Sequence, residues 1–241
     1  MPAARLAAMI LAVLLLAASP VPADCRQLLL SLGASWGATA ARVRRFERGA
    51  ADQPWKQVGP AVPASLGRRG LGWGLGLHPA GEFLGPPKRE GDGKSPAGVF
   101  DLRLATGYDP APPPGTRLRY RTATPTLRCV DDPRSAFYNQ LVDEARVKKD
   151  WSSAEDMRRP DGLYRLLVWV GHNDAPVEAP RGSCIFLHLR SSATSTTEGC
   201  TAFDTPPMEA LLRWLDPERH PVLVQLPVQS YRALAAPWGL P

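Results

Sequence analysis

The chain has 241 residues, of which 44% are hydrophobic and 22% charged, with a formal net charge of +6. This hydrophobic content excludes an intrinsically disordered chain, and the 26 prolines and 21 glycines indicate a loop-rich, mainly β protein. A basic chain suits an anionic surface or polymer such as a cell wall. Its arginines are scattered and it has no nucleic-acid-binding motif, so we expect no nucleic acid partner.

The N-terminus has the pattern of a secretory signal. A single basic residue precedes the apolar run 6–18, which is too short for a membrane-spanning helix, and small residues suit cleavage after Ala23. We expect residues 1–23 to be a signal peptide and residues 24–241 to be a single domain, because no repeat or low-complexity tract divides them. The mature protein is then secreted, periplasmic or cell-wall-associated, without stable membrane insertion.

The first half of this domain reads as short strands separated by loops. Alternating apolar residues predict neighbouring strands over 26–32 and 40–47, joined by a turn, and a further short strand over 55–59. Four glycines flank Trp73 in the segment 68–76. We interpret this segment as a loop packed close to the sheet, with a wall of a substrate groove as the alternative.

The second half contains two expected helices and two further strands. With Ser135 as its N-cap and apolar residues on one face, the segment 135–147 is predicted to be helical. Thr205 followed by two prolines predicts the start of a helix over 206–215. Strands are expected over 163–171 and 221–227.

The segment 182–204 contains both a thiol and an imidazole. The short apolar run 184–189 predicts a buried strand that carries His188 near its end, and Cys200 follows twelve residues later, after a Ser/Thr loop. Such a loop can fold back and bring the two side chains within hydrogen-bond reach, where the imidazole can take the thiol proton. Gly199, without a Cβ, would let a substrate carbonyl approach the backbone amides around Cys200.

Two elements of the sequence resemble the L,D-transpeptidase (YkuD-type) catalytic domain. The segment 197–200, TEGC, is similar to that family's [ST]-x-G-C element, with His188 in the place of its upstream histidine. The segment 95–100, SPAGVF, is similar to its [ST]-P-x-G-x-F element. The resemblance spans about residues 26–227 and implies a mainly β fold, an L,D-transpeptidase-like β-sandwich of mixed sheets with two peripheral helices.

The resemblance also implies an exported cysteine acyltransferase that acts on peptidoglycan stem peptides and needs no cofactor. Cys200 would attack the carbonyl of a diaminoacyl–D-alanine bond, and His188 would act first as base and then as acid. Backbone amides at Gly199, Cys200 or Thr201 would hold the oxyanion. An amine acceptor then gives a 3-3 cross-link, whereas water gives a trimmed peptide.

Substrate-binding residues are expected on both sides of the thiol and imidazole. Thr197 belongs to the matched element, and His172 and Asn173 follow the expected strand over 163–171 as candidates for the groove wall. The family's arginine two positions after the cysteine is here Ala202. Strand alternation places Arg190 on the same face as His188, so we expect Arg190 to bind a substrate carboxylate in its stead. The other basic candidates are Lys88, Arg89 and Lys94.

Four cysteines in an exported chain suggest disulfides. With Cys200 kept as a thiol, we favour a bridge between Cys129 and Cys184 and leave Cys25 free in a frayed N-terminus. Cys25 also permits a lipoprotein interpretation, against which the preceding Asp24 is a poor lipobox residue.

Three alternatives stay open beside the transpeptidase interpretation. A bond between Cys184 and Cys200 would make the chain a non-enzymatic cell-wall-binding module, and a secreted Cys/His amide hydrolase would use the same chemistry on another substrate. A zinc site from His172, Cys184, His188 and Cys200 lacks the usual ligand spacings, so we expect no metal.

Overall fold

A computed structural model describes residues 19–79 and 85–241, and most of its regular structure is β-strand. The strands are β1 (Gln27–Gly33), β2 (Ala40–Glu47), β3 (Lys56–Ser65), β4 (Leu71–Trp73), β5 (Ser95–Gly107), β6 (Arg119–Thr122), β7 (Leu127–Val130), β8 (Leu141–Asp143), β9 (Ala154–Asp156), β10 (Leu166–Val170), β11 (Phe186–Leu189), β12 (Thr201–Phe203) and β13 (Val222–Pro227). The helices are α1 (Thr205–Trp214), the short 3-10 helix η1 (Pro217–Arg219) and α2 (Val228–Leu234). The mainly β prediction is confirmed.

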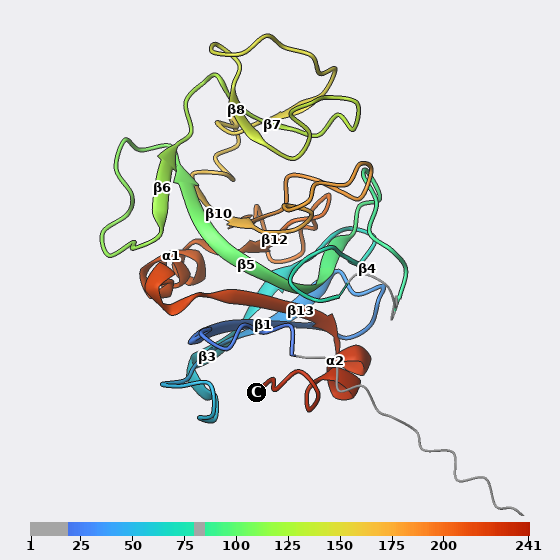
Figure 1. Cartoon of the computed structure of the whole chain (residues 1–241). Helices are drawn as coiled ribbons and strands as arrows, with labels where there is room; N and C mark the ends of the chain where they lie inside the picture. The colour runs from blue at the N-terminus through green and yellow to red at the C-terminus, as the bar shows by residue number, and fades with distance from the viewer. Residues whose placement is uncertain (1–18, 80–84) are drawn as a thin grey trace, which may run out of the picture.

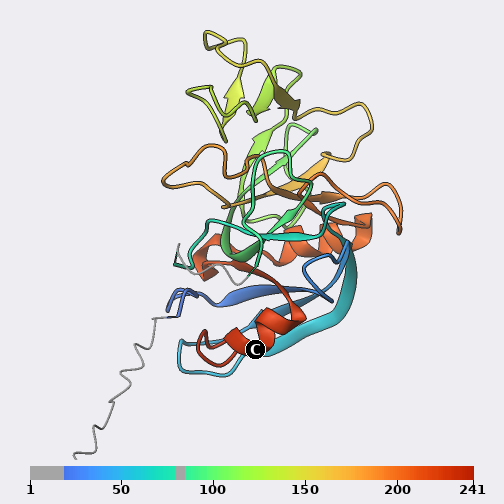
Figure 2. The same cartoon turned by 90° about the vertical axis from the view of Figure 1, so that its right-hand side faces the viewer.

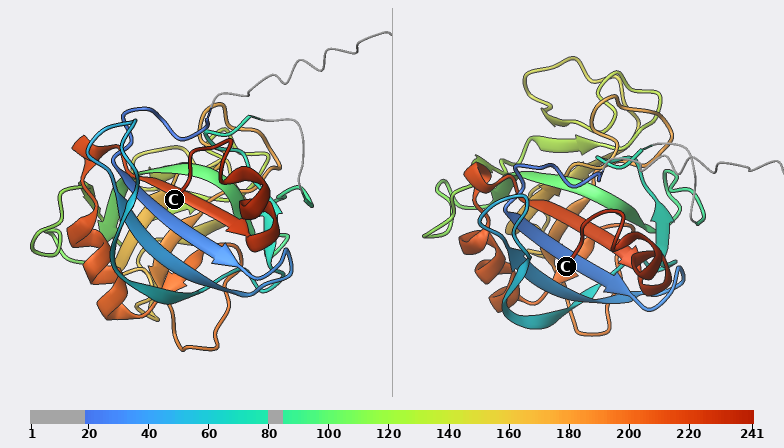
Figure 3. Two further views of the ribbon diagram at one scale, coloured as in Figure 1. Left: turned by 90° about the horizontal axis from the view of Figure 1, so that it is seen from below. Right: turned by 60° about the horizontal axis from the view of Figure 1, so that its bottom comes forward.

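The main sheet closes on itself into a barrel. Its strands follow the order β10-β11-β12-β3-β2-β1-β13-β5, and β10 also pairs with β5. Closure depends on the 13-residue strand β5, because its residues 98–101 pair with β13 and its residues 102–107 pair with β10. The ladder is mixed, since β1 runs parallel to β13 and antiparallel to β2. Seen from below, α1 and α2 lie outside the strands on opposite flanks (Figure 3).

A second, three-stranded sheet in the order β8-β7-β9 lies at one end of the barrel. We call residues 127–156, which contain it, the cap (Figures 1 and 2). The disulfide between Cys129 of β7 and Cys184, just before β11, joins the cap to the barrel, with an S–S length of 2.01 Å. The predicted pairing of these two cysteines is therefore confirmed. Apolar side chains from both sides pack around the disulfide, among them Leu127, Trp169 and Phe186.

The prediction of a helix over 135–147 is wrong, because this segment folds as turns around β8. Asn139 has a φ of 58°, which breaks helical continuity. Its side chain donates to the carbonyls of His172 and Asn173 and accepts from the amide of Cys184. The Ser135 hydroxyl donates to Asp150 instead of capping a helix. Tertiary hydrogen bonds have thus replaced the local helical preference. The second peripheral helix is α2, for which no helix was expected.

The other predicted elements are close to those observed. The strands expected over 26–32 and 40–47 are the antiparallel neighbours β1 and β2, and the helix over 206–215 is α1. The strand expected over 55–59 continues to Ser65, although it contains Pro60 and Pro63. Prolines fit here because Pro63 has a ladder partner only on the β2 side, and Pro60 lies where the β2–β3 register shifts between Val58 and Val62. The segment 68–76 lies against the sheet as expected, but it is not a loop throughout, because its residues 71–73 form β4 and pair with β5.

The N-terminal apolar run 6–18 lies outside the described residues, and cleavage after Ala23 stays a prediction. Cys25 is not in a frayed segment, since it is fully buried and its thiol donates to the carbonyl of Gln27 at 3.3 Å. The next backbone amide, that of Arg26, donates to Arg219 at 2.8 Å, which ties this segment to the domain. In the described part of the chain, no helix has the length and apolarity to cross a membrane.

Candidate active site

The segments 95–100 and 197–200 meet at the carbonyl oxygen of Cys200. The Ser95 hydroxyl donates to this oxygen at 2.8 Å, and the Thr197 hydroxyl donates to it at 2.7 Å. Each hydroxyl also accepts a backbone hydrogen bond, Ser95 from Gly67 at 2.9 Å and Thr197 from Gly199 at 3.2 Å. These four bonds fix the backbone on both sides of Cys200, and so they fix where its side chain starts.

Gly98 of the SPAGVF element has a packing role. Its φ is 142°, and a Cβ there would lie 2.0 Å from Cε1 of His78. The His78 ring fills that space, accepts from the Val99 amide at Nδ1 (3.0 Å), and donates from Nε2 to the Gly74 carbonyl at 3.0 Å. The glycine therefore lets a buried histidine join β5 to the segment after β4.

Cys200 is a buried free thiol in the position directly before β12. Its Sγ accepts from the Phe186 amide at 3.3 Å and lies 3.6 Å from the Cys184 carbonyl, to which it donates weakly. Burial, and next the Glu155 carboxylate, raise the pKa of the Cys200 thiol far above its usual range. At rest, the sulfur is therefore protonated.

His188 lies on β11, which is the parallel neighbour of β12, and its side chain is buried. The Nδ1–H donates to the Leu189 carbonyl at 2.7 Å, so the lone pair of the neutral ring is on Nε2. Burial lowers the pKa of His188 to about 4. The imidazole is thus neutral at physiological pH and able to accept a proton. Among the described residues, no hydrogen bond joins His188 to Cys200.

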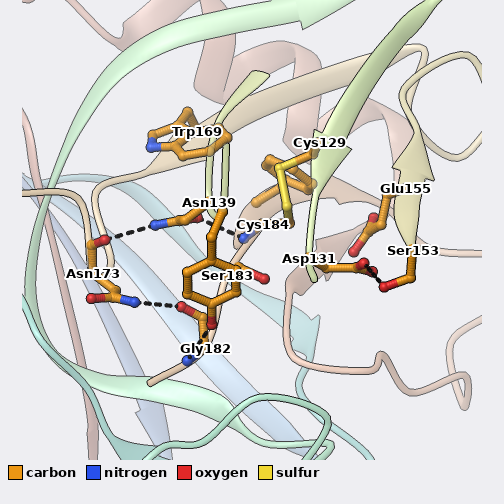
Figure 4. The surroundings of a disulfide bond; sticks show 12 residues. Cys129, Asp131, Asn139, Ser153, Glu155, Trp169, Asn173, Gly182, Ser183 and Cys184 are labelled. Carbon is orange, nitrogen blue, oxygen red and sulfur yellow. Dashed lines mark hydrogen bonds between the residues drawn. A yellow bond between two sulfur atoms is a disulfide. The ribbon is translucent and has the colours of Figure 1, made fainter. Parts of the chain in front are cut away.

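Both side chains line one cleft of about 500 Å³, which we call the Cys200 cleft. The barrel contributes the thiol, the imidazole and the loop 196–199, whereas the cap contributes Asp131 and Glu155. Figure 4 shows these two carboxylates near the Cys129–Cys184 disulfide, with Asp131 accepting from the Ser153 hydroxyl. The remaining lining residues are Lys88, Glu90, Gly91, Arg159, Leu163, Tyr164, Ser183, Cys184 and Ile185.

Two of the expected site residues, Gly199 and Thr197, line this cleft beside Cys200. Thr201 does not, because its hydroxyl donates to Gln225 at 2.9 Å in the barrel interior. Arg190 also points elsewhere. Its guanidinium donates to both carboxylate oxygens of Asp204, at 2.8 and 2.6 Å.

His172 and Asn173 organise the chain between β10 and β11 and do not line the Cys200 cleft. His172 is fully enclosed, with Nε2 3.1 Å from the Arg181 carbonyl, and burial lowers its pKa to about 3. The Asn173 amide donates to the carbonyls of Glu178 and Gly182 at 2.8 and 2.9 Å. These bonds hold the loop 173–182, which leads directly to Cys184.

Sequence reasoning missed the cap residues of the cleft and Tyr164. Glu155 is directly opposite Cys129 in the β7–β9 ladder, and Cys129 is bonded to Cys184. The predicted disulfide was therefore a signal that β7 lies near the thiol, but the pairing of β7 with β9 has no signature in the sequence. Lys88, one of the alternative basic residues, does line the cleft.

Fold and site together define a mainly β barrel that presents a free thiol and a neutral imidazole in one cleft. Comparisons with protein-family models, with curated proteins and with solved structures find no match. Within residues 19–79 and 85–241, no group of three or more His, Cys, Asp or Glu side chains is arranged to hold a metal ion. Cys184, one of the four residues considered for zinc, is consumed in the disulfide.

Proposed function

We propose that this chain is an exported cysteine acyltransferase that acts on peptidoglycan stem peptides, as an L,D-transpeptidase does. The observation that carries the proposal is the convergence of Ser95 and Thr197, one from each matched element, on the carbonyl of Cys200. The basic net charge suits an anionic polymer as the partner. The expected signal at residues 1–23 suits a secreted, periplasmic or wall-associated location.

The proposal includes the finer fold expectation, an L,D-transpeptidase-like β-sandwich. In a closed barrel, opposite walls pack face to face across one core, much as the two sheets of a sandwich do. The long strand β5, which pairs with both β13 and β10, is the element that distinguishes the barrel from two separate sheets.

In the proposed reaction, His188 Nε2 takes the proton of Cys200, and the thiolate attacks the peptide carbonyl. The C–N bond breaks, the proton passes from His188 to the leaving amine, and the acyl group remains on sulfur as a thioester. The amine of a second stem, or water, then resolves the thioester and regenerates the thiol. Because the thiol donates to the Cys184 carbonyl at rest, its side chain must leave this hydrogen bond before it meets the imidazole.

The oxyanion donor in this scheme is the backbone amide of Cys200. The amide of Gly199 is engaged, since it donates to Thr197 Oγ1 at 3.2 Å. The carbonyl of Cys200, in the peptide unit that follows this amide, is held by two hydroxyl donors, so the backbone beside the amide is ordered before substrate arrives.

The non-enzymatic alternative required a bond between Cys184 and Cys200. In the structure Cys184 is bonded to Cys129, and Cys200 is free. The geometry therefore favours a reactive thiol over a purely structural one.

The test is incubation of the purified chain with tetrapeptide and pentapeptide muropeptides, followed by mass spectrometry of the products and of the protein. We expect release of the terminal D-amino acid and an acyl adduct on the peptide that contains Cys200, with neither in Cys200→Ala. If the Cys200 thiol is shown by mass spectrometry to be reduced and unmodified, yet forms no adduct and no product with any muropeptide, the proposed substrate is refuted.

A further inference from the structure

Glu155 of β9 presents a carboxylate without a cationic partner at the wall of the Cys200 cleft. It accepts a hydrogen bond from the Tyr164 hydroxyl at 2.5 Å, and no ion pair forms on it among the described residues. Tyr164 is buried, and its ring packs edge-on against His188 with 5.0 Å between ring centroids. One side chain therefore separates this carboxylate from the imidazole of the proposed catalytic pair.

The cations of the cleft are already paired with other groups. Lys88 Nζ lies 2.8 Å from Asp92, and Arg159 Nη2 lies 2.5 Å from Asp161. The carboxylate of Glu198 is likewise paired, with Arg68 at 2.8 Å. Arg159 attracts the Glu155 carboxylate through space, but no ion pair or hydrogen bond between the two is formed in the described part of the chain.

Two further carboxylates face the same space from other segments. Glu90 accepts from the hydroxyls of Tyr138 and Ser183 at 2.5 and 2.7 Å, and Asp131 accepts from Ser153. Hydroxyl donors satisfy hydrogen bonds without neutralising charge. The wall beside the thiol thus has an excess of negative charge. The titratable and charged groups that face it are Lys88, Glu90, Asp131, Arg159, Tyr164, His188, Glu198 and Cys200.

This arrangement disfavours charge on both Glu155 and the nucleophile. Burial, with Asp131 and Glu90 nearby, raises the pKa of Glu155 to about 7, against the opposing effects of the Tyr164 hydrogen bond and the Arg159 charge. The Glu155 carboxylate in turn opposes ionisation of Cys200. A cationic group placed against Glu155 would relieve both effects, since it would stabilise the carboxylate and cancel its field at the sulfur.

We propose that Glu155 is a specificity-determining residue of this cleft, whose carboxylate binds a primary ammonium group of the peptide that Cys200 attacks and thereby makes the thiol reactive. The inference rests on the proposed function in taking Cys200 as the nucleophile. It adds that substrates with a free amino group near the scissile bond are preferred, and that the preference is expressed in the chemical step as well as in binding.

The test compares two thiol reagents that differ in charge, 2-aminoethyl methanethiosulfonate, a cation, and methyl methanethiosulfonate, which is neutral. With either reagent the thiolate attacks the sulfenyl sulfur, a mixed disulfide forms and methanesulfinate leaves. Peptide mass spectrometry locates the modification at Cys200. The ratio of the two rates reports the charge of the cleft, because the thiolate population is common to both reactions.

We expect the cationic reagent to be favoured in the wild type, and Glu155→Gln to lower the rate ratio by about tenfold, the effect of one pKa unit of charge interaction. The matched control is Asp156→Asn, the next residue on β9, which pairs with Arg128 at 3.1 Å and does not line the cleft. It should leave the ratio unchanged. Glu155→Gln should also speed the reaction of Cys200 with the neutral reagent near neutral pH.

A second arm needs only the wild type and therefore does not depend on how the variants fold. The preference for the cationic reagent should increase as the pH rises through about 7, where Glu155 ionises. A ratio that is flat with pH, or that Glu155→Gln leaves unchanged, would overturn the role of Glu155 while leaving Cys200 as the nucleophile. Failure of Cys200 to react with either reagent in any variant would overturn the proposed function itself.

Discussion

The Cys129–Cys184 disulfide should raise the free energy of unfolding of this protein substantially. It closes a loop with a sequence separation of 55 and joins the cap to the barrel. In the chain-entropy treatment, a loop of this length restricts the unfolded chain by about 4 kcal/mol. We therefore expect the double variant Cys129→Ala/Cys184→Ala to lose about 4 kcal/mol in free energy of unfolding, within a general range of about 2–5 kcal/mol.

Urea unfolding followed by tryptophan fluorescence measures this loss, and Trp169 is a suitable reporter because it packs in the cluster around the disulfide. Cys25→Ala is the control for removing a buried sulfur without a bond, since Cys25 is fully buried and unpaired. A loss in the double variant no larger than in Cys25→Ala would refute the loop-entropy reasoning.

The same variant should also expose the proposed nucleophile. The cap contributes Asp131 and Glu155 to the cleft, and the disulfide holds β7 against the chain that leads to β11. With the bond removed, we expect the cap to open at a lower free energy than the whole protein unfolds, and Cys200 to react faster with a neutral thiol reagent. Equal rates in wild type and variant would show that side-chain packing alone holds the cap closed.

Four further outcomes follow from the site. Cys200→Ser should abolish turnover in the muropeptide assay and change the melting temperature little, whereas a large loss of stability would indicate a structural sulfur. His188→Ala should slow alkylation of Cys200 by iodoacetamide near neutral pH, and an unchanged pH–rate profile would remove His188 from the base role. Arg190→Ala should leave kcat/KM within about twofold, because the guanidinium is directed to Asp204; a loss of about tenfold would restore Arg190 as a substrate ligand. The pKa of His188 is about 4 against an ordinary 6.5, so the unfolded chain takes up this proton first, and the urea midpoint should fall as the pH drops from 6.5 towards 4, with a smaller fall in His188→Gln.

Much of the barrel could be predicted because its strands are specified locally. The alternation in the segment 40–47 corresponds to buried Ala41 and Val43 facing the core, and β1 next to it is buried along almost its whole length. The start of α1 was also readable to within one residue from Thr205 and the prolines after it, although the N-cap is Asp204 and Thr205 is the first helical residue. These features depend on neighbours in sequence, and local patterns are enough to find them.

The cap could not be predicted in the same way. Its strands β8 and β9 have three residues each, and the turns between them are set by contacts with distant residues. Asn139 is the clearest example, since its side chain bonds to residues 33, 34 and 45 positions away. A helical pattern in the segment 135–147 was outweighed by such contacts. The carboxylates of the cleft were missed for the same reason.

The candidate catalytic residues were found from their local motif, but their environment was not. Burial of Cys200 and the proximity of Glu155 both oppose the transfer of the thiol proton to the imidazole that the sequence suggests, and Glu155 belongs to the cap. The prediction that Arg190 binds a substrate carboxylate overlooked Asp204. The carboxylate of Asp204, two residues beyond Ala202, accepts both hydrogen bonds of the Arg190 guanidinium.

The parallel pairing of β11 with β12 has a consequence for how related chains could be found. Leu187 is opposite Thr201 and Leu189 is opposite Phe203 in this ladder, so the strands themselves fix the positions of His188 and Cys200. The exposed residues 191–194 form a loop between the two strands that does not set this geometry, whereas Thr197, nearer the cysteine, helps to set it by donating to the Cys200 carbonyl. Insertions or deletions in this loop should therefore be tolerated, and a search pattern with a fixed number of residues between the histidine and the cysteine would overlook chains that share the same site.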